Sequence, residues 1–281
     1  MYIVIGKSGQ LAKELALCFE GQNITFLGRG DINLFNKSEL EESLISHSSK
    51  AIINTAAYTD VDAAERNQDE AFKLNSLAVN HLSELCSKHK IRLIHISTDF
   101  VFDGNKKTPY DTYDSPNPIN IYGKSKLAGE EALRKNIKNN FSIVRTSWLY
   151  SIYGKNFLKT MIKLMNERKE ISVVDDQIGS PTYARGLANF LCSLIEKPQI
   201  KPIYHWSDIG YVSRYDFAEA IYEEGLRLGI IKDVELKPIS SYELHSSVKR
   251  PSFSAFNPCK DSKIHWRDNL VSAMESLARE Y

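Results

Sequence analysis

Apolar and polar positions follow two alternating patterns in the first half of the chain. Short runs of apolar, often β-branched residues have the length of buried strands and lie at 2–5, 24–27, 51–54, 92–97 and 142–146. Between them, apolar residues recur at helical spacing at 10–19, at 37–46 with Asn36 as the expected cap, and at 62–89, as one helix or two abutting ones. Another helix precedes the last strand. This alternation predicts βαβ units and a parallel sheet with helices on both faces.

The second half of the chain is patterned less regularly. Helical spacing recurs at about 157–168, 184–195, 215–228 and 268–279, and strand patterns occur at 172–174 and 202–206. We expect an α/β fold, with a Rossmann-type doubly wound parallel sheet in residues 1–150 and a smaller substrate-binding part in residues 151–281. Segments of the second part are expected to return to the main sheet.

Composition narrows the class of protein. Hydrophobic residues make up 42% and charged residues 25% of the 281 residues, as in ordinary soluble globular proteins. The formal net charge of +1 excludes a large basic surface for binding nucleic acid. No apolar run approaches the length that spans a membrane. The four cysteines lie far apart without a CxxC pair, so we expect no disulfide framework, no zinc site and a reducing cytoplasm.

A glycine-containing turn follows the first strand and opens the first helix. Its spacing is GxxGxxA, with Gly6, Gly9, Gln10 and Leu11 in the turn and Ala12 in place of a third glycine. Such a turn lets backbone N–H groups approach a pyrophosphate at the positive end of the helix. We therefore expect residues 1–150 to bind a nicotinamide dinucleotide.

The turn after the second strand bears on the choice of cofactor. A carboxylate there usually binds the ribose hydroxyls of NAD, and an arginine favours the 2′-phosphate of NADP. Arg29 stands where it would meet the phosphate, and Asp31 and Ile32 come slightly later. We expect NADPH, with NADH tolerated, although Arg29 as an ordinary solvated loop cation stays open as an alternative.

Two polar groups point to acid–base chemistry. Ser97, Thr98 and Asp99 end the fourth strand, where open parallel sheets bind ligands. Tyr122 and Lys126 lie one helical turn apart and share a helix face. An adjacent ammonium lowers the pKa of a tyrosine from its usual value of about 10, toward a useful acid–base range. The alternative is an exposed pair on a solvated helix.

With these motifs in place, the chain resembles the extended short-chain dehydrogenase/reductase superfamily and, within it, the dTDP-4-dehydrorhamnose reductase family. Supporting stretches lie at 54–62, 145–148, 176–182 and 250–251, so the resemblance covers nearly the whole chain. It implies NADPH-dependent reduction of the C4 keto group of dTDP-4-dehydro-L-rhamnose to dTDP-L-rhamnose. The product would serve cell-surface polysaccharides such as the O-antigen of lipopolysaccharide.

The resemblance also implies roles for site residues. Tyr122 would donate the proton to the carbonyl oxygen at C4 of the sugar, and Thr98 would hydrogen-bond that oxygen. Lys126 would hold the nicotinamide ribose and lower the pKa of the tyrosine. Asp99 would contact a sugar hydroxyl, and Trp148 would pack on the sugar.

Further positions follow from the same resemblance. Residues after the third strand would line the cofactor, namely Ala56, Ala57, Tyr58 and Thr59. Arg250 would contact the nucleotide diphosphate, with an ordinary surface arginine as the alternative. Phe100 joins the substrate site where a tyrosine is common, so a hydroxyl contact is lost. Relatives can bind magnesium through glutamates at a dimer contact; Glu14 matches one such position, but Arg185 stands at another, so we expect no metal and an exposed Glu14.

Several alternatives remain open at this point. Another 4-ketoreductase or an epimerase acting on a nucleotide sugar would carry much of the same pattern. A 4,6-dehydratase would need a glutamate where Phe100 stands. A non-catalytic nucleotide-binding regulatory subunit, as for methionine adenosyltransferase, also resembles this family. The sequence leaves both a monomer and a homodimer open as the assembly.

Overall fold

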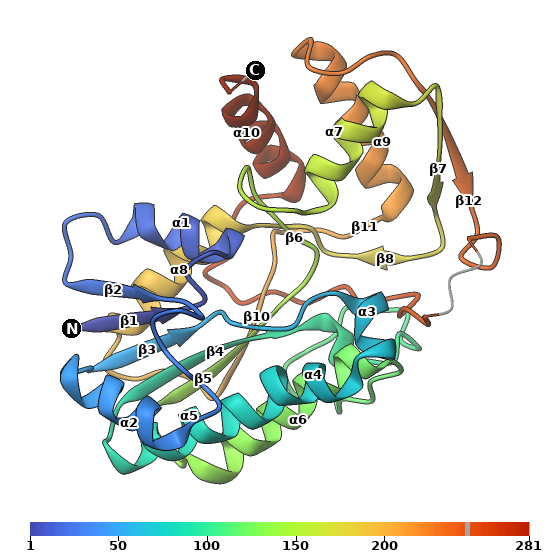
Figure 1. Ribbon diagram of the computed structural model, residues 1–281. Coiled ribbons are helices and arrows are strands. Elements are labelled where there is room, and N and C mark those ends of the chain that lie inside the picture. The colour runs from blue at the N-terminus through green and yellow to red at the C-terminus, as the bar shows by residue number, and fades with distance from the viewer. Residues whose placement is uncertain (245–247, 281) are drawn as a thin grey trace.

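The computed structural model describes residues 1–244 and 248–280. Over these residues the chain forms a lower body around a parallel six-stranded sheet and a smaller upper body (Figure 1). The strand order is β10-β5-β4-β3-β1-β2. The strands are β1 (Tyr2–Ile5), β2 (Ile24–Leu27), β3 (Ala51–Asn54), β4 (Arg92–Thr98), β5 (Phe141–Thr146) and β10 (Ile203–Trp206). The predicted α/β fold of Rossmann type is confirmed.

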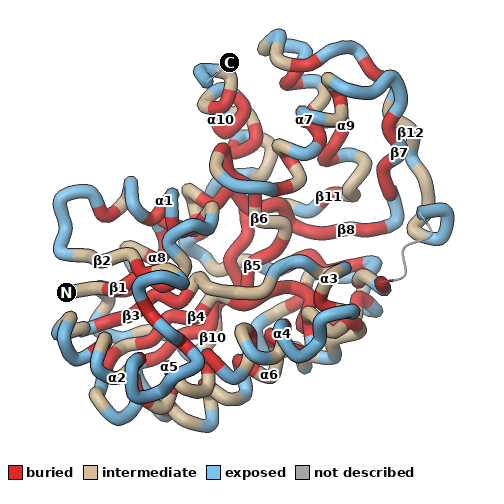
Figure 2. The backbone as a smooth tube through the Cα atoms, viewed as in Figure 1, coloured by how far each residue is buried: buried red, intermediate tan, exposed pale blue. Residues whose placement is uncertain are grey.

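Helices cover both faces of this sheet because its strands are apolar on both sides. Ile3 and Ile5 pack toward α2 (Lys37–Ser46), α5 (Ala78–Lys88) and α6 (Ile121–Asn136). Val4, between them in β1, packs toward α1 (Gln10–Cys18) and α8 (Ala184–Glu196). The alternation follows from the two-residue period of a strand. Buried strands between more exposed helices are visible in Figure 2.

The expected helix over 62–89 is broken into shorter pieces. The structure has α3 (Val61–Arg66), α4 (Gln68–Phe72), a π-helical turn (Lys73–Leu77) and then α5. Within the π-helical turn, Asn75 is buried and its side chain accepts a hydrogen bond from the backbone N–H of Tyr58 (2.8 Å) and donates to the Tyr58 carbonyl (3.0 Å). The broken helix thereby fixes the loop that follows β3.

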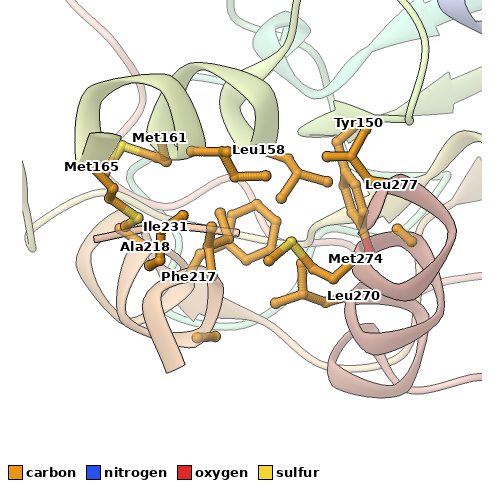
Figure 3. Close-up of a cluster of buried hydrophobic side chains, with 14 of the residues drawn as sticks. Tyr150, Leu158, Met161, Met165, Phe217, Ala218, Ile231, Leu270, Met274 and Leu277 are labelled. Atoms are coloured by element: carbon orange, nitrogen blue, oxygen red, sulfur yellow. The ribbon is translucent and has the colours of Figure 1, made fainter. Parts of the chain in front are cut away.

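The upper body has its own core, built from three helices. These are α7 (Phe157–Glu167), α9 (Arg214–Arg227) and α10 (Trp266–Ala278), which surround Phe217 and several methionines (Figure 3). Beside them β7 (Glu170–Val174) pairs in parallel with β12 (Glu235–Ile239), a strand that the sequence pattern did not predict. α8 and β10 come from the second half of the sequence but pack in the lower body.

Short crossing segments join the two bodies. β6 (Leu149–Tyr150) pairs with β9 (Thr182–Tyr183), and β8 (Ile178–Gly179) pairs with β11 (Val212–Ser213). The stretch 250–257 runs between the bodies, where the Ser254 N–H donates to the Ile178 carbonyl (2.8 Å). In residues 1–244 and 248–280, no helix combines the length and the apolar composition needed to cross a membrane.

Candidate active site

Two adjoining cavities open at the carboxyl ends of the strands. The first has a volume of about 840 Å³ and is lined by the loops after β1, β2 and β3. The second, of about 490 Å³, is lined by the end of β4, the start of α6 and the segment after β5. Ser8, Gly9, Thr55 and Ala57 line both. The cavities are therefore parts of one cleft, at the edge of the sheet where ligands bind in open α/β folds.

The glycine turn between β1 and α1 borders both cavities. Gly6 has φ +104°, and a Cβ there would lie 2.6 Å from Thr55 Oγ1, so only glycine fits without strain. Gly9 caps α1 and lines both cavities. Gln10 and Leu11 line the second cavity, where the Gln10 side chain donates to the Leu149 carbonyl (3.1 Å). The N-terminal end of α1 therefore faces the cleft.

Arg29, Asp31 and Ile32, the three residues predicted to contact the cofactor after β2, lie in different surroundings. Arg29 and Ile32 line the first cavity, and Arg29 is exposed. Asp31 instead forms an ion pair with Lys7 (2.5 Å) and accepts from the Gly28 N–H (2.7 Å). The hydrogen bond with Lys7 is the main reason that the pKa of Asp31 is lowered. Arg29 is therefore available to a ligand in the first cavity, whereas the Asp31 carboxylate is already bound to Lys7 and to the Gly28 N–H.

The loop after β3 runs along the cleft. Ala56, Ala57 and Tyr58 line the first cavity, and Ala57 and Thr59 line the second. Asn54, at the end of β3, accepts a hydrogen bond from the Ala56 N–H (3.2 Å). All four residues that the sequence predicted beside the cofactor therefore lie on the cleft.

The end of β4 and the start of α6 meet at the second cavity. Thr98, Asp99, Tyr122 and Lys126 all line it. α6 approaches closely because Gly123 has no side chain: a Cβ there would overlap the Phe100 carbonyl oxygen. The Phe100 ring packs edge-on against Tyr122, with centroids 5.7 Å apart.

The ionisable groups of this cavity are shifted mainly by burial. Burial raises the pKa of Tyr122 to about 12, and a hydrogen bond with Thr98 only partly opposes it. Burial lowers the pKa of Lys126 to about 8. The Lys126 Nζ donates to the Ile96 carbonyl (2.7 Å). The expected lowering of the tyrosine pKa is therefore wrong for this structure, because desolvation outweighs any effect of the ammonium.

Asp99 is held in place by two hydroxyl groups. It accepts from Ser254 Oγ (2.6 Å) and from Thr98 Oγ1 (3.1 Å). Burial nevertheless raises its pKa to about 6. Ser254 comes from the stretch between the two bodies, and the sequence analysis did not place it here.

Trp148 lies at the other side of the second cavity in an unusual backbone conformation, with φ +45°. The Arg214 guanidinium lies 3.6 Å from the centroid of its ring. Gly179 also packs against the ring, where a Cβ would overlap the indole. Sequence reasoning missed Arg214, although a basic residue in the first turn of a helix is electrostatically unfavourable and could have drawn attention to it. Burial lowers its pKa to about 10, and the charge of Asp99 opposes this.

Arg250 and Glu14 are not among the residues that line the two cavities. Arg250 forms an ion pair with Asp62 (2.7 Å). Glu14 is fully buried rather than exposed, and its carboxylate accepts hydrogen bonds from Ser151 (2.6 Å) and from Arg185 in the neighbouring helix α8 (2.9 Å). The expectation of an exposed Glu14 is therefore wrong. Among the described residues, no group of three or more His, Cys, Asp or Glu side chains is arranged to hold a metal ion.

Comparisons with known proteins agree with this geometry. The family model described as RmlD substrate binding domain matches residues 1–279. A dTDP-4-dehydrorhamnose reductase of Aggregatibacter actinomycetemcomitans is 36% identical over 92% of this chain and 90% of its own length. A dTDP-4-keto-6-deoxy-D-glucose reductase of Streptomyces niveus is 31% identical over 98% and 97%. The crystal structure of a Bacillus anthracis dTDP-4-dehydrorhamnose reductase in complex with NADP is similar, with a TM-score of 0.92, 35% identity and 98% of each chain covered.

Proposed function

The chain belongs to the dTDP-4-dehydrorhamnose reductase family, and on that premise we propose that it is an NADPH-dependent oxidoreductase. Its proposed reaction is reduction of the C4 keto group of dTDP-4-dehydro-L-rhamnose to dTDP-L-rhamnose. One observation carries the proposal. The phenol of Tyr122, the amino group of Lys126 and the hydroxyl of Thr98 line the second cavity, which adjoins the first cavity at the glycine turn.

The residues of the first cavity fit a nicotinamide dinucleotide. Gly6 leaves room that a Cβ would fill, and Gly9 places the start of α1 where a pyrophosphate would meet backbone N–H groups. Arg29 would hold the 2′-phosphate of NADPH. The loop at 56–59 would lie along the cofactor toward the second cavity. When bound, NADPH supplies the hydride.

Tyr122 is the proposed proton donor. Because burial raises its pKa to about 12, its phenolic proton stays in place at neutral pH. Reduction builds negative charge on the carbonyl oxygen, and a phenol within hydrogen-bond distance can give that oxygen its proton. The Thr98 hydroxyl would stabilise the same charge. Lys126 would bind the ribose of the cofactor.

The sugar is proposed to bind against Trp148 and Asp99 in the second cavity. Gly179 and Arg214 hold the indole of Trp148 in place, so its apolar surface would suit the 6-deoxy edge of the sugar. We further propose that residues 151–281 contribute to the sugar side of the cleft, with Arg250 toward the diphosphate. Phe100, beside Tyr122, would belong to the same side.

The proposed compartment is the cytoplasm. All four cysteines, each among the described residues, are free thiols, which agrees with a reducing compartment of this kind.

A second candidate function is reduction of a different dTDP-4-keto-6-deoxy sugar. The relative from Streptomyces niveus, named as a dTDP-4-keto-6-deoxy-D-glucose reductase, favours it because the identity is nearly as high. The same cleft would serve both reactions, since the sugars differ in stereochemistry rather than in the reacting group.

The test is consumption of NADPH with dTDP-4-dehydro-L-rhamnose generated in situ, compared with other nucleotide keto sugars and with a reaction lacking sugar. Rapid oxidation with a rhamnose-configured product by NMR supports the proposal. Faster oxidation with another keto sugar supports the second candidate. Absence of oxidation with every sugar, in protein that still binds NADPH, would favour the non-catalytic binding role.

A further inference from the structure

The segment between β6 and α7 packs on the glycine turn and plays no part in the function proposed above. Asn156, the N-cap of α7, donates from its side-chain amide to Gln10 Oε1 (3.1 Å). The amide nitrogen of Gln10 donates in turn to the Leu149 carbonyl (3.1 Å). Gly154 also approaches this side chain, because an added Cβ would lie 3.3 Å from Gln10 Cβ. The segment therefore lies against the first turn of α1.

Lys155 belongs to this segment and lines the second cavity, which Ser8 and Gly9 of the glycine turn also line. Both of these residues border the first cavity as well, so a ligand at the glycine turn is accessible from either cavity. Lys155 is exposed, and no residue in the described part of the chain forms an ion pair or a hydrogen bond with its side chain. Its charge is therefore available to a ligand.

The other basic side chains of the cleft are placed differently. Among the described residues, Arg29 and Lys126 are the remaining ones that line a cavity. Arg29 follows β2, where it would hold the 2′-phosphate of the cofactor. Lys126 is buried, and its Nζ donates to the Ile96 carbonyl (2.7 Å). This leaves Lys155 as the exposed basic side chain of the second cavity.

The first turn of α1 supplies hydrogen-bond donors but little charge. Its N-cap is Gly9, no side chain caps the helix and no acidic residue lies in the first turn. N–H groups left free in this way bind anions, but together they act as only about half a positive charge. The pyrophosphate of a dinucleotide carries more negative charge than this, and a lysine binds phosphate oxygens as a point charge. A cation beside the turn would therefore strengthen binding.

We propose that Lys155 binds the pyrophosphate of the nicotinamide cofactor. The glycine turn supplies backbone N–H groups to this pyrophosphate, and Lys155 supplies the opposite charge. The inference rests on the proposed function, because it takes the glycine turn as the cofactor site. Since the segment leads directly into α7 of the upper body, the second half of the chain contributes to cofactor binding as well as to the sugar side.

Lys155→Gln tests this contact by binding alone, without turnover. The NADPH dissociation constant, measured by fluorescence titration, should rise about 10-fold. Added salt should weaken binding by the parent protein more steeply than binding by the variant, because a charged contact is screened. Lys155→Arg keeps the charge and should restore most of the affinity. A dissociation constant for Lys155→Gln within about twofold of the parent value would overturn the proposal.

Two shorter ligands show which phosphate group Lys155 contacts. Adenosine 2′-monophosphate lacks the pyrophosphate, and dTDP carries the diphosphate of the proposed sugar nucleotide. Each should bind Lys155→Gln and the parent protein equally, as measured by displacement of NADPH for the first and by calorimetry for the second. Weaker binding of the 2′-monophosphate would assign Lys155 to the 2′-phosphate, and weaker binding of dTDP would assign it to the substrate. Either result would contradict the proposal.

Lys13→Gln removes the same charge nearby and serves as the matched control. Lys13 is exposed in α1, its Nζ lies 5.6 Å from the centroid of the Tyr153 ring, and it is not among the residues that line the two cavities. This variant should bind NADPH as the parent protein does. An equal loss of affinity in both variants would show a general effect of net charge and would refute the contact.

The binding measurements also separate this inference from the proposed function. Unchanged NADPH binding by Lys155→Gln refutes only the contact of Lys155 with the pyrophosphate. Failure of the parent protein to bind NADPH would refute the proposed function and this contact with it.

Discussion

The two cavities of the cleft are built in different ways. The first is formed by three successive strand-to-loop units, all within residues 5–74. The second depends on pieces distant in the sequence: Trp148 is supported by Gly179 and Arg214, and Asp99 by Ser254. Local βα units thus form the proposed cofactor side, whereas the proposed sugar side depends on contacts with segments distant in the sequence. Substitutions in the first cavity should therefore weaken the binding of NADPH, and substitutions in the second should weaken the binding or reduction of the sugar.

The largest expected effect is that of Tyr122→Phe in the second cavity. Removing the hydroxyl removes the proposed proton donor, which should lower kcat by about 1000-fold. NADPH binding, followed by fluorescence titration, should change little. Tyr113→Phe, at an exposed tyrosine, is the control and should retain full activity. Substantial turnover by Tyr122→Phe would exclude this residue as the donor.

Gly6→Ala should act on the first cavity. With φ +104° and a Cβ only 2.6 Å from Thr55 Oγ1, alanine strains the turn, and the NADPH dissociation constant should rise about 100-fold. The control is Gly30→Ala, because an added Cβ there meets nothing within 4 Å. Equal losses for the two variants would show that the close approach at Gly6 is unimportant.

Gly179→Ala tests the second cavity, because Gly179 packs against Trp148. A Cβ at this position would displace the Trp148 ring, so KM for the keto sugar should rise about 10-fold, equivalent to ~1.4 kcal/mol. The dissociation constant of NADPH should be unchanged. Gly186→Ala, where the nearest atom to an added Cβ is 3.8 Å away, should alter neither constant. A loss confined to NADPH binding would contradict the division between the cavities.

The smallest effect concerns the junction of the bodies. Asp208 accepts from the Tyr183 N–H (3.0 Å), and burial raises its pKa to about 7. The unfolded chain therefore loses this proton at lower pH than the folded one, so the free energy of unfolding falls as pH rises from about 4 to about 7. In urea unfolding, Asp208→Asn should flatten this dependence by about 1–2 kcal/mol. An unchanged pH dependence would mean that Asp208 is ionised in the fold.

The same division explains what the sequence could predict. The strands of the main sheet are confirmed, because the central ones, β1, β3, β4 and β5, are buried on both faces over most of their length. The Asn36 cap is also confirmed, since its side chain accepts from the N–H groups of Ser38 and Glu39. The paired two-residue strands β8 and β11 have no periodicity to detect. β12 contains Pro238, which weakens any strand pattern.

The candidate site was predictable in its parts rather than in its interactions. The residues that line the cleft follow from strand ends and helix spacing. The contacts of Arg214 with Trp148 and of Ser254 with Asp99 join residues far apart in the sequence, so the sequence pattern does not show them, although the basic residue at the start of α9 is a local signal. The pKa of Tyr122 was predicted in the wrong direction, because spacing shows the lysine nearby but not the burial of the phenol.

The most direct test of the central claim follows a labelled hydride. The reaction would be run with NADPH carrying deuterium at the reactive C4 position of the nicotinamide and with dTDP-4-dehydro-L-rhamnose. We predict deuterium at C4 of a rhamnose-configured product, seen by NMR as loss of the C4 proton signal. Absence of deuterium from C4 of the sugar, while the protein binds NADPH, would contradict a reductase and require another role for this cleft.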